Sequence, residues 1–365
     1  MRVEKKPEKA VLGSHRVVAE NEKIAMLRKA GIVGRGENNL TKYKDMKNRK
    51  PAPQSVGRSA LDGGAFGRDR NALSKLPHWV RGDGRFGGLL FLLFLQISLF
   101  AQDPKQKDEL QNIIQTEKAF AQASIDKGTK NAFLEYLSKE SIIFNNSMPV
   151  NGLEHWQNLD FKGVITWQPI IAEIAGSLDL GYTIGNYQLH NTTAEEKSSS
   201  FGSFIRLWKK QADNSWKVAI DMGVPHGEVN PNTTNITELY PVFKPYELKN
   251  QMVLAERMVF MKDHFYWKNA KSSLNQFDTH LAQNVRIYRR NLKPIIGKQN
   301  TKVFLKKVYN KNLIYTGLKA VSSNAGDLVC VYGVISGGGK SGTYLRIYKQ
   351  EAKDAWKIVV EMVDL

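Results

Sequence analysis

Two carboxylates at matched places in the chain, Asp221 and Glu361, are the best candidates for chemistry in this sequence. Each follows a strand-like run, SWKVAI before Asp221 and AWKIVV before Glu361. A carboxyl group that projects into an apolar pocket, where burial tunes its pKa, can act as a general acid or base. We therefore take Asp221 and Glu361 as candidate catalytic residues for a proton transfer.

The same two residues also have a structural interpretation. If Asp213 and its successor form a two-residue turn, Arg206 lies directly opposite Asp221. The same register in the second half of the chain pairs Arg346 with Glu361. Opposed unlike charges stabilise a sheet by roughly 0.2–1 kcal/mol, and a nearby arginine lowers the pKa of a carboxylate, which makes it a poor base at pH 7. The sequence thus favours structural ion pairs over catalysis.

Aromatic residues alternate with the two arginines. Phe204, Arg206 and Trp208 share one face of a predicted strand, and the second half of the chain matches them with Tyr344, Arg346 and Tyr348. Such a face either lines a ligand pocket or packs a sheet or a dimer interface. Four more aromatic residues are candidate pocket walls, with plain core packing as the alternative: Trp167, Tyr182, Tyr315 and Tyr332.

The remaining reactive residues give weaker signals. Glu117 and Glu256, on predicted helices, either reach a pocket or pair with surface cations. The histidines lack the spacing that is typical of metal ligands, so no metal site is predicted. Cys330 lies in an apolar strand-like run and is expected to be buried rather than nucleophilic. None of these patterns implies a cofactor.

The chain contains two copies of one unit. FGSFIRLWKKQADNSWKVAIDMG (201–223) aligns without a gap to SGTYLRIYKQEAKDAWKIVVEMV (341–363), and IIQTEKAF (113–120) aligns to MVLAERMV (252–259). The second alignment pairs Glu117 with Glu256. Each copy places its helices, around 110–125 and 131–139 in the first, before its strands, which indicates an α+β fold with an antiparallel sheet. Residues 226–244, rich in Pro, Asn and Thr, are the predicted linker.

In the first copy this order of motifs resembles the SnoaL-like, ketosteroid isomerase-like branch of the nuclear transport factor 2-like superfamily. The motifs are an early E-x-x-F (117–120), P-x-x-G (149–152), W-x-P (167–169), DLGYTIG (179–185) and a closing DNSWK with Asp221. The resemblance implies two tandem cystatin-like cones, at 105–225 and 245–365, each with N-terminal helices on a curved antiparallel sheet around an apolar pocket. It implies no reaction, because members of this fold include isomerases, cyclases, dehydratases and binding modules.

The first hundred residues have a different character. Residues 1–85 are basic and rich in turn-forming residues, so we expect a disordered leader or a mis-annotated start. Residues 86–101 form an apolar run that begins after the basic Arg85 and ends at the small residue Ala101. This is the layout of a secretory signal peptide. The run is too short for a stable membrane span. We therefore expect a periplasmic or secreted protein, cleaved near Ala101.

The net charge of +18 is unevenly distributed. Residues 1–85 carry +11, residues 102–240 carry −5 and residues 241–365 carry +12. The basic leader has few aromatic residues for stacking on bases, so nucleic acid is not an expected partner. The unlike charges of the two copies fit an intrachain pseudo-dimer. The alternatives are a homodimer, an anionic surface facing the second copy, and a plain solvated face.

Together these patterns predict an exported protein that binds a small apolar molecule in the cone pocket. Two alternatives stay open. One is a cofactor-independent isomerase, cyclase or dehydratase that uses a pocket carboxylate, and the other is an interaction scaffold at a surface.

Overall fold

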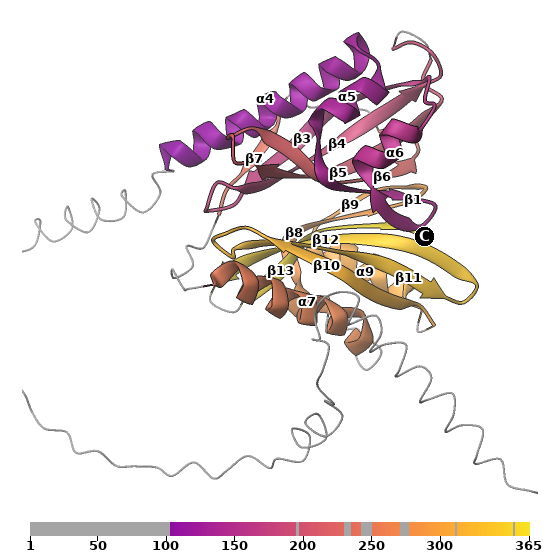
Figure 1. Cartoon of the computed structure of the whole chain (residues 1–365). Coiled ribbons are helices and arrows are strands. Elements are labelled where there is room, and N and C mark those ends of the chain that lie inside the picture. Colours follow the sequence, from indigo (N-terminus) through magenta and orange to yellow (C-terminus); the bar gives the residue numbers. More distant parts are fainter. Residues whose placement is uncertain are drawn as a thin grey trace, which may run out of the picture. The chain divides into compact units, whose positions relative to one another are not determined.

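The structure, a computed structural model, describes residues 103–194, 197–229, 235–241, 250–270, 277–310, 312–352 and 355–365. The predicted leader (1–85), the predicted signal segment (86–101) and residues 230–234 and 242–244 of the predicted linker lie outside the described residues. All of the described residues belong to one compact unit, residues 100–365. Figure 1 shows this unit with its helices and strands labelled.

The first copy consists of helices packed on one sheet. Its elements are α4 (Pro104–Asp126), α5 (Thr129–Tyr136), β1 (Leu137–Asn145), β2 (Met148–Asn151), α6 (Gly152–Asn158), β3 (Val164–Ile174), β4 (Leu180–His190), β5 (Ser200–Lys210), β6 (Trp216–His226) and β7 (Thr237–Leu239). The strand order is β2-β1-β6-β5-β4-β3-β7. The long strands β3 to β6 are antiparallel neighbours, whereas β1 pairs with β6 in parallel.

The second copy repeats this plan. Its elements are α7 (Gln251–Ala270), α8 (Phe277–His280), β8 (Leu281–Arg289), β9 (Leu292–Ile296), α9 (Lys298–Val308), β10 (Ile314–Ser322), β11 (Leu328–Gly337), β12 (Lys340–Ala352) and β13 (Ala355–Asp364). The strand order β10-β11-β12-β13-β8-β9 matches that of the first sheet without β7. The predicted α+β class, with helices first and an antiparallel sheet after them in each of two tandem copies, is confirmed.

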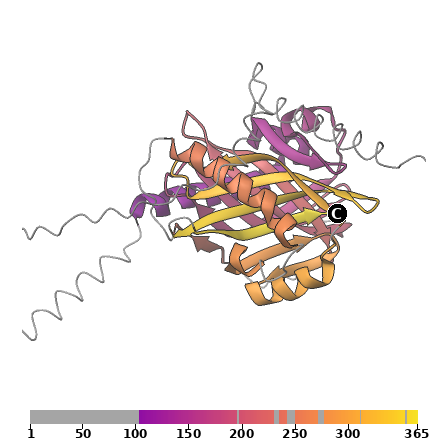
Figure 2. The same cartoon turned by 90° about the horizontal axis from the view of Figure 1, so that it is seen from below.

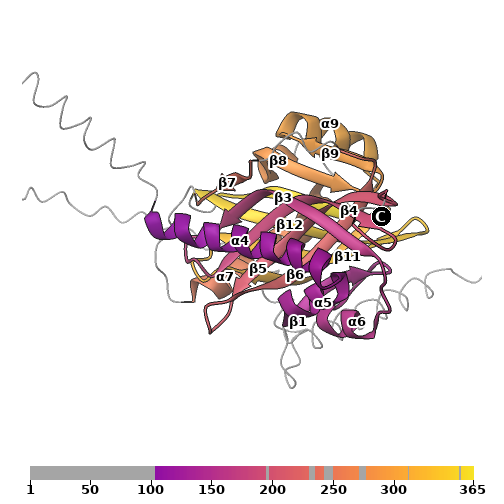
Figure 3. The ribbon, with the colours of Figure 1, turned by 90° about the horizontal axis from the view of Figure 1, so that it is seen from above.

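Local sequence explains why α4 forms and where it lies. The side chain of Asp103 accepts a hydrogen bond from the amide of Lys105 (3.0 Å), and Pro104 occupies the first turn, where its missing N–H costs nothing. Apolar residues at helical spacing, such as Ile113 and Phe120, face the sheet and are fully buried. Figure 3 shows α4 lying across β3 to β6. One charged residue, Glu117, shares this buried face.

Two predicted boundaries differ from the structure. The second helix ends at Tyr136, and Leu137 to Lys139 already belong to β1. The predicted linker contributes β7, which pairs in parallel with β3 and so extends the first sheet. Short elements of this kind are set by tertiary pairing, which residue patterns of a few positions do not reveal.

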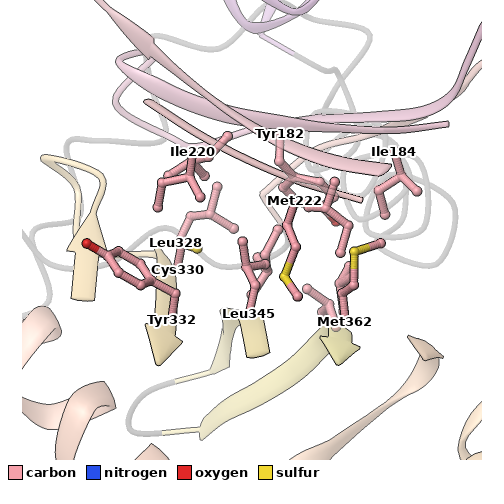
Figure 4. Packing of buried hydrophobic residues seen from close by; sticks show 14 of the residues in the cluster. Tyr182, Ile184, Ile220, Met222, Leu328, Cys330, Tyr332, Leu345 and Met362 are labelled. Carbon is pink, nitrogen blue, oxygen red and sulfur yellow. The ribbon is translucent and has the colours of Figure 1, made fainter. Parts of the chain in front are cut away.

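Strand alternation gives each sheet two different faces. In β5, Phe204, Arg206 and Trp208 face the helices, while Ile205 and Leu207 face the other way. The second set joins residues of β11, β12 and β13, such as Cys330, Leu345 and Met362, in one buried apolar cluster (Figure 4). The two copies therefore pack against each other through their sheets, and each keeps its helices on the opposite face.

The predicted ion-pair register is confirmed, although the predicted turn is wrong. Arg206 pairs with Asp221 and Arg346 with Glu361. The turn between β5 and β6 contains three residues, since the amide of Gln211 donates to the carbonyl of Ser215 (2.8 Å). The register shifts back between Leu207 and Trp208, where β6 carries one extra residue. This β-bulge cancels the longer turn and restores the pairing.

Candidate functional site

The centre of the first copy is an arginine held between two carboxylates. Arg206 on β5 donates through Nη1 to Oε1 of Glu117 on α4, and through Nε to Oδ1 of Asp221 on β6 (3.0 Å). The side chains of Glu117 and Arg206 are 0% and 3% exposed, and that of Asp221 is 15% exposed. Hydrogen-bonded charges of opposite sign are the usual condition under which a charged group is buried.

Glu117 collects hydrogen bonds from three further side chains. The indole N–H of Trp167 donates to its Oε1 (2.6 Å), and the hydroxyl of Thr183 donates to its Oε2 (2.5 Å). The indole N–H of Trp208 also lies within 3.2 Å of Oε2. The carboxylate of Glu117 is thereby saturated with donors and inaccessible. It positions Arg206 and has no free oxygen for a ligand.

A cavity of about 320 Å³ opens beside this triad, near the lower end of the range for ligand sites, roughly 300–1,000 Å³. Asp221 and Arg206 contribute its charged wall. The remaining walls are mostly apolar and aromatic: Phe133, Ile143, Phe144, His155, Trp156, Phe161, Ile165, Trp167, Tyr187, Leu189, Phe204 and Gly223. The helices and the sheet of the first copy thus border a partly open apolar space with one carboxylate at its edge.

The pKa of Asp221 corrects one expectation from the sequence. Burial raises this pKa above its ordinary value, the Arg206 guanidinium lowers it and the charge of Glu117 raises it again. Arg206 therefore acts in the predicted direction, but burial is the largest cause and the net direction is upward. Glu117, on a helix far away in the sequence, shares the guanidinium with Asp221 and adds to the upward direction.

The second copy builds the same centre with different charges. Arg346 donates to Asp263 on α7 (2.8 Å) and to Glu361 on β13 (2.5 Å). A second guanidinium, that of Arg289 on β8, also pairs with Glu361. Burial raises the pKa of Glu361, but the guanidinium groups of Arg289 and Arg346 outweigh burial and hold it at about 2. In the second copy two carboxylates pair with two arginines, whereas in the first copy two carboxylates share one arginine.

One position accounts for the difference in charge. Arg289 and Asn145 hold the same place, since Asn145 pairs with Met148 in the β1–β2 hairpin and Arg289 pairs with Leu292 in the β8–β9 hairpin. Asn145 carries no charge, so Asp221 has Arg206 as its one ion-pair partner among the described residues. The first centre is left with a partly compensated carboxylate at a cavity, and the second with a neutral cluster in which Asp263, Arg346 and Glu361 are fully buried.

Aromatic rings enclose both arginines in the same way. The guanidinium of Arg206 lies 4.5–4.9 Å from the ring centres of Phe120, Trp167 and Phe204. That of Arg346 lies 4.6–5.0 Å from three matched tyrosine rings, those of Tyr266, Tyr315 and Tyr344. Cation–π attraction of this kind stabilises a desolvated guanidinium by about 2 kcal/mol or more. The hydroxyls of Tyr344 and Tyr348 donate to Asp263, which replaces the indole donors of the first copy.

The residue that sequence analysis missed is Asp263. The repeat alignment pairs Glu117 with Glu256, but Glu256 accepts a bond from the amide of Ser322 (3.2 Å) and does not contact Arg346. Asp263 lies seven residues further along α7, which is about two helical turns and therefore the same face. A shift of seven residues leaves the apolar residues of a helix on the same face, so the alignment does not reveal that Glu256 is the wrong match for Glu117. An aromatic residue follows the acidic residue by three positions in both helices, Phe120 after Glu117 and Tyr266 after Asp263, and this spacing identifies Asp263 as the match.

The structure brings together some of the predicted pocket residues and separates others. Trp167, Phe204, Arg206 and Asp221 line the cavity of the first copy, and Trp208 is buried behind them against Glu117. Tyr315 and Arg346 lie in the buried centre of the second copy with Glu361. Tyr182 and Tyr332 do not lie inside the cones. They face the cluster between the copies, because they alternate with Thr183 and Val331 along their strands.

Within the described ranges, no group of three or more His, Cys, Asp or Glu side chains is arranged to hold a metal ion. Likewise, none of the helices from α4 to α9 combines the length and the apolar character that crossing a bilayer requires.

No protein-family model and no curated protein matches the sequence of this chain. Solved structures that it is similar to include a cystatin-like fold protein of Burkholderia xenovorans, with 13% identity over 30% of this chain and 90% of that one at a TM-score of 0.25. Another is a putative ketosteroid isomerase of Parabacteroides distasonis, with 20% identity, 33% and 88% coverage and a TM-score of 0.24.

A third similar structure is an NTF2-like protein of unknown function from Pseudomonas putida, with 11% identity, 31% and 88% coverage and a TM-score of 0.26. Each likeness covers about a third of this chain. At these identities and TM-scores, the three likenesses carry no argument about a family or an activity.

Proposed function

We propose that the first copy binds a small, largely apolar molecule whose polar end donates a hydrogen bond to Asp221. The observation that carries this proposal is the asymmetry between the two centres. Asp221 has one arginine and borders a cavity of about 320 Å³, whereas Glu361 has two arginines and is fully buried. A donor group on a ligand would supply the partner that Arg289 supplies in the second copy.

The chemistry of the walls narrows the ligand class. Aromatic rings such as those of Phe144, Trp156 and Tyr187 favour a flat or aromatic molecule. A hydroxyl or amine at one end would be attracted to the carboxylate of Asp221, while an anion would be repelled by it. Arg206 is not expected to bind a ligand strongly, since its Nη1 already pairs with Glu117 and its Nε with Asp221.

Gly223 provides a direct test of the cavity. A Cβ placed on Gly223 would meet Tyr187 at 3.4 Å and the carbonyl of Ser203 at 3.6 Å, which are ordinary contacts. We expect Gly223→Leu to fill the cavity and leave the triad intact. A matched control is Gly227→Leu, because a Cβ there has nothing within 4 Å and Gly227 does not line the cavity.

The measurement is native mass spectrometry of the protein after incubation with extract of the cells that produce it. The expected result is a retained ligand that is lost in Gly223→Leu, weakened about tenfold or more in Asp221→Asn, and kept in Gly227→Leu. Retention of the same ligand by Gly223→Leu would place it elsewhere and contradict the proposal.

Proton transfer by Asp221 is the second candidate function, favoured by its raised pKa and its position at an apolar cavity. A ligand that emerges chemically changed from the wild type, and unchanged from Asp221→Asn, would support an enzyme such as an isomerase, cyclase or dehydratase. A ligand that both proteins return unchanged would support binding alone.

Export and the intrachain pseudo-dimer belong to the same proposal. The layout of residues 86–101 supports export with cleavage near Ala101, and the mature N-terminus found by sequencing tests it. The apolar cluster shared by the two sheets supports a pseudo-dimer within one chain. A monomeric mass in sedimentation is expected, and a stable homodimer built on these sheet faces would contradict it.

A further inference from the structure

The outer side of α7 exposes large apolar residues. Leu254, Met258, Met261 and Phe265 are 47%, 46%, 53% and 39% exposed. Their spacing of four, three and four residues places them in one stripe along the helix. Of the α7 side chains that the structure describes, one other is exposed, that of Arg257. The outer side of α7 therefore combines an apolar stripe with a cation and no exposed acid.

The fold of the second copy does not explain this stripe. The inner face of α7 carries the residues that pack on the sheet, including Ala255, Val259 and Tyr266. In the first copy, α4 provides an internal comparison, because Glu117 and Phe120 match Asp263 and Tyr266. The α4 positions that match the stripe hold Asp108, Asn112, Gln115 and Ala119. The same architecture thus forms with a polar outer face.

Basic residues lie on the same side of the second copy. In the view from below (Figure 2), α7 lies in front of the sheet of the second copy and α9 lies at its edge. Helix α9, KQNTKVFLKKV, contains four lysines and no acid, and Lys306 and Lys307 in its last turn are exposed. Val303 and Val308 on this helix are also 56% and 43% exposed. Residues 241–365 carry a net charge of +12, so the surrounding field is positive.

We propose that this face of the second copy, the outer sides of α7 and α9, docks on an anionic lipid bilayer. Apolar side chains that enter the headgroup region, flanked by lysines that meet anionic lipids, are the combination that holds amphipathic helices at such surfaces. The stripe on α7 supplies the first element, and Arg257 with the lysines of α9 supplies the second. Charge complementarity favours an anionic surface, and the row of exposed apolar side chains matches the depth that an amphipathic helix reaches in the headgroup region of a bilayer.

The test is sedimentation of the full chain with lipid vesicles. Vesicles contain phosphatidylcholine alone or with about 30 mol% phosphatidylserine. The proposal expects binding to the anionic vesicles that weakens as salt rises, because the charges are exposed. Met258→Ser with Met261→Ser is expected to reduce the partition coefficient about tenfold or more. Lys306→Gln with Lys307→Gln is expected to reduce binding to anionic vesicles only.

Asn112→Ser with Gln115→Ser, at the matched α4 positions, is the control and is expected to bind like the wild type. Because every variant retains residues 86–101, a difference between variants cannot come from that apolar segment. Unchanged binding of the α7 variant would overturn the proposal, as would equal binding of the wild type to neutral and anionic vesicles. A concentration-dependent dimer that the α7 variant abolishes, without vesicle binding, would assign the face to a second copy of the chain and equally overturn it.

Discussion

Replacing Glu361 with glutamine tests the electrostatic asymmetry of the two centres. In Glu361→Gln the side chain keeps its shape but loses its charge, and the guanidinium groups of Arg289 and Arg346 lose a shared partner. The folded protein holds the pKa of Glu361 at about 2, compared with an ordinary value of 4.5. A difference of about 2.5 pH units corresponds to about 3 kcal/mol of free energy of unfolding.

The sign follows from the direction of the pKa change. The folded state binds the proton of Glu361 less tightly than the unfolded state does, so the carboxylate stabilises the fold above pH 4.5. This stabilisation decreases as the pH falls from 4.5 towards 2. Glu361→Gln is therefore expected to lower the free energy of unfolding by about 3 kcal/mol at pH 7, and by roughly half as much at pH 3.

Urea denaturation at pH 7, 5 and 3 measures this difference, and Asp221→Asn is the matched variant in the first copy. The pKa of Asp221 is raised, so its ionisation opposes folding as the pH rises, and loss of the charge at pH 7 should cost much less than in Glu361→Gln. Equal losses in the two variants, or a loss in Glu361→Gln that does not shrink at pH 3, would refute the reasoning.

Two further predictions concern the buried residues of the second copy. Asp263→Asn is expected to lower the free energy of unfolding by about 3–5 kcal/mol, because it breaks a buried ion pair with Arg346. Glu256→Gln should lower it by less than about 1 kcal/mol. Equal losses in the two variants on denaturation would contradict the roles assigned to Asp263 and Glu256. Cys330 is fully buried and its pKa is raised by burial, so a thiol-reactive dye should label it no faster than the protein unfolds; rapid labelling of the folded protein would place it at an accessible surface instead.

Several parts of the candidate site were predictable from sequence because they depend on local periodicity. Alternation along β5 places Phe204, Arg206 and Trp208 on one face, and the repeat predicts the same for β12. The pairing of Arg206 with Asp221 was also predicted, although a three-residue turn and a compensating bulge produce it. The turn is one residue longer than predicted, and the bulge in β6 compensates for that extra residue. The residue pattern does not distinguish this arrangement from a regular hairpin.

Other parts could not be predicted because they depend on contacts between distant segments. Tyr182 has the composition of a pocket wall, yet it faces the other copy, since the side of a strand that meets the helices is decided by helix packing. Asp263 was missed because two turns of an apolar helix are equivalent in periodicity. The apolar stripe on α7 has the spacing that is typical of a buried helix face, and only the folded chain shows that these side chains are exposed.

The duplication is evident from the repeated sequence, and the order of helices and strands, with the arginine that faces a carboxylate in each copy, follows from patterns within one element or between adjacent strands. Which carboxylate is available depends on contacts that form in the folded chain. Glu117 lies 89 residues from Arg206, and Arg289 lies 72 residues from Glu361. A pKa and a cavity depend on every charge and surface within a few ångströms, and the folded chain sets those neighbours.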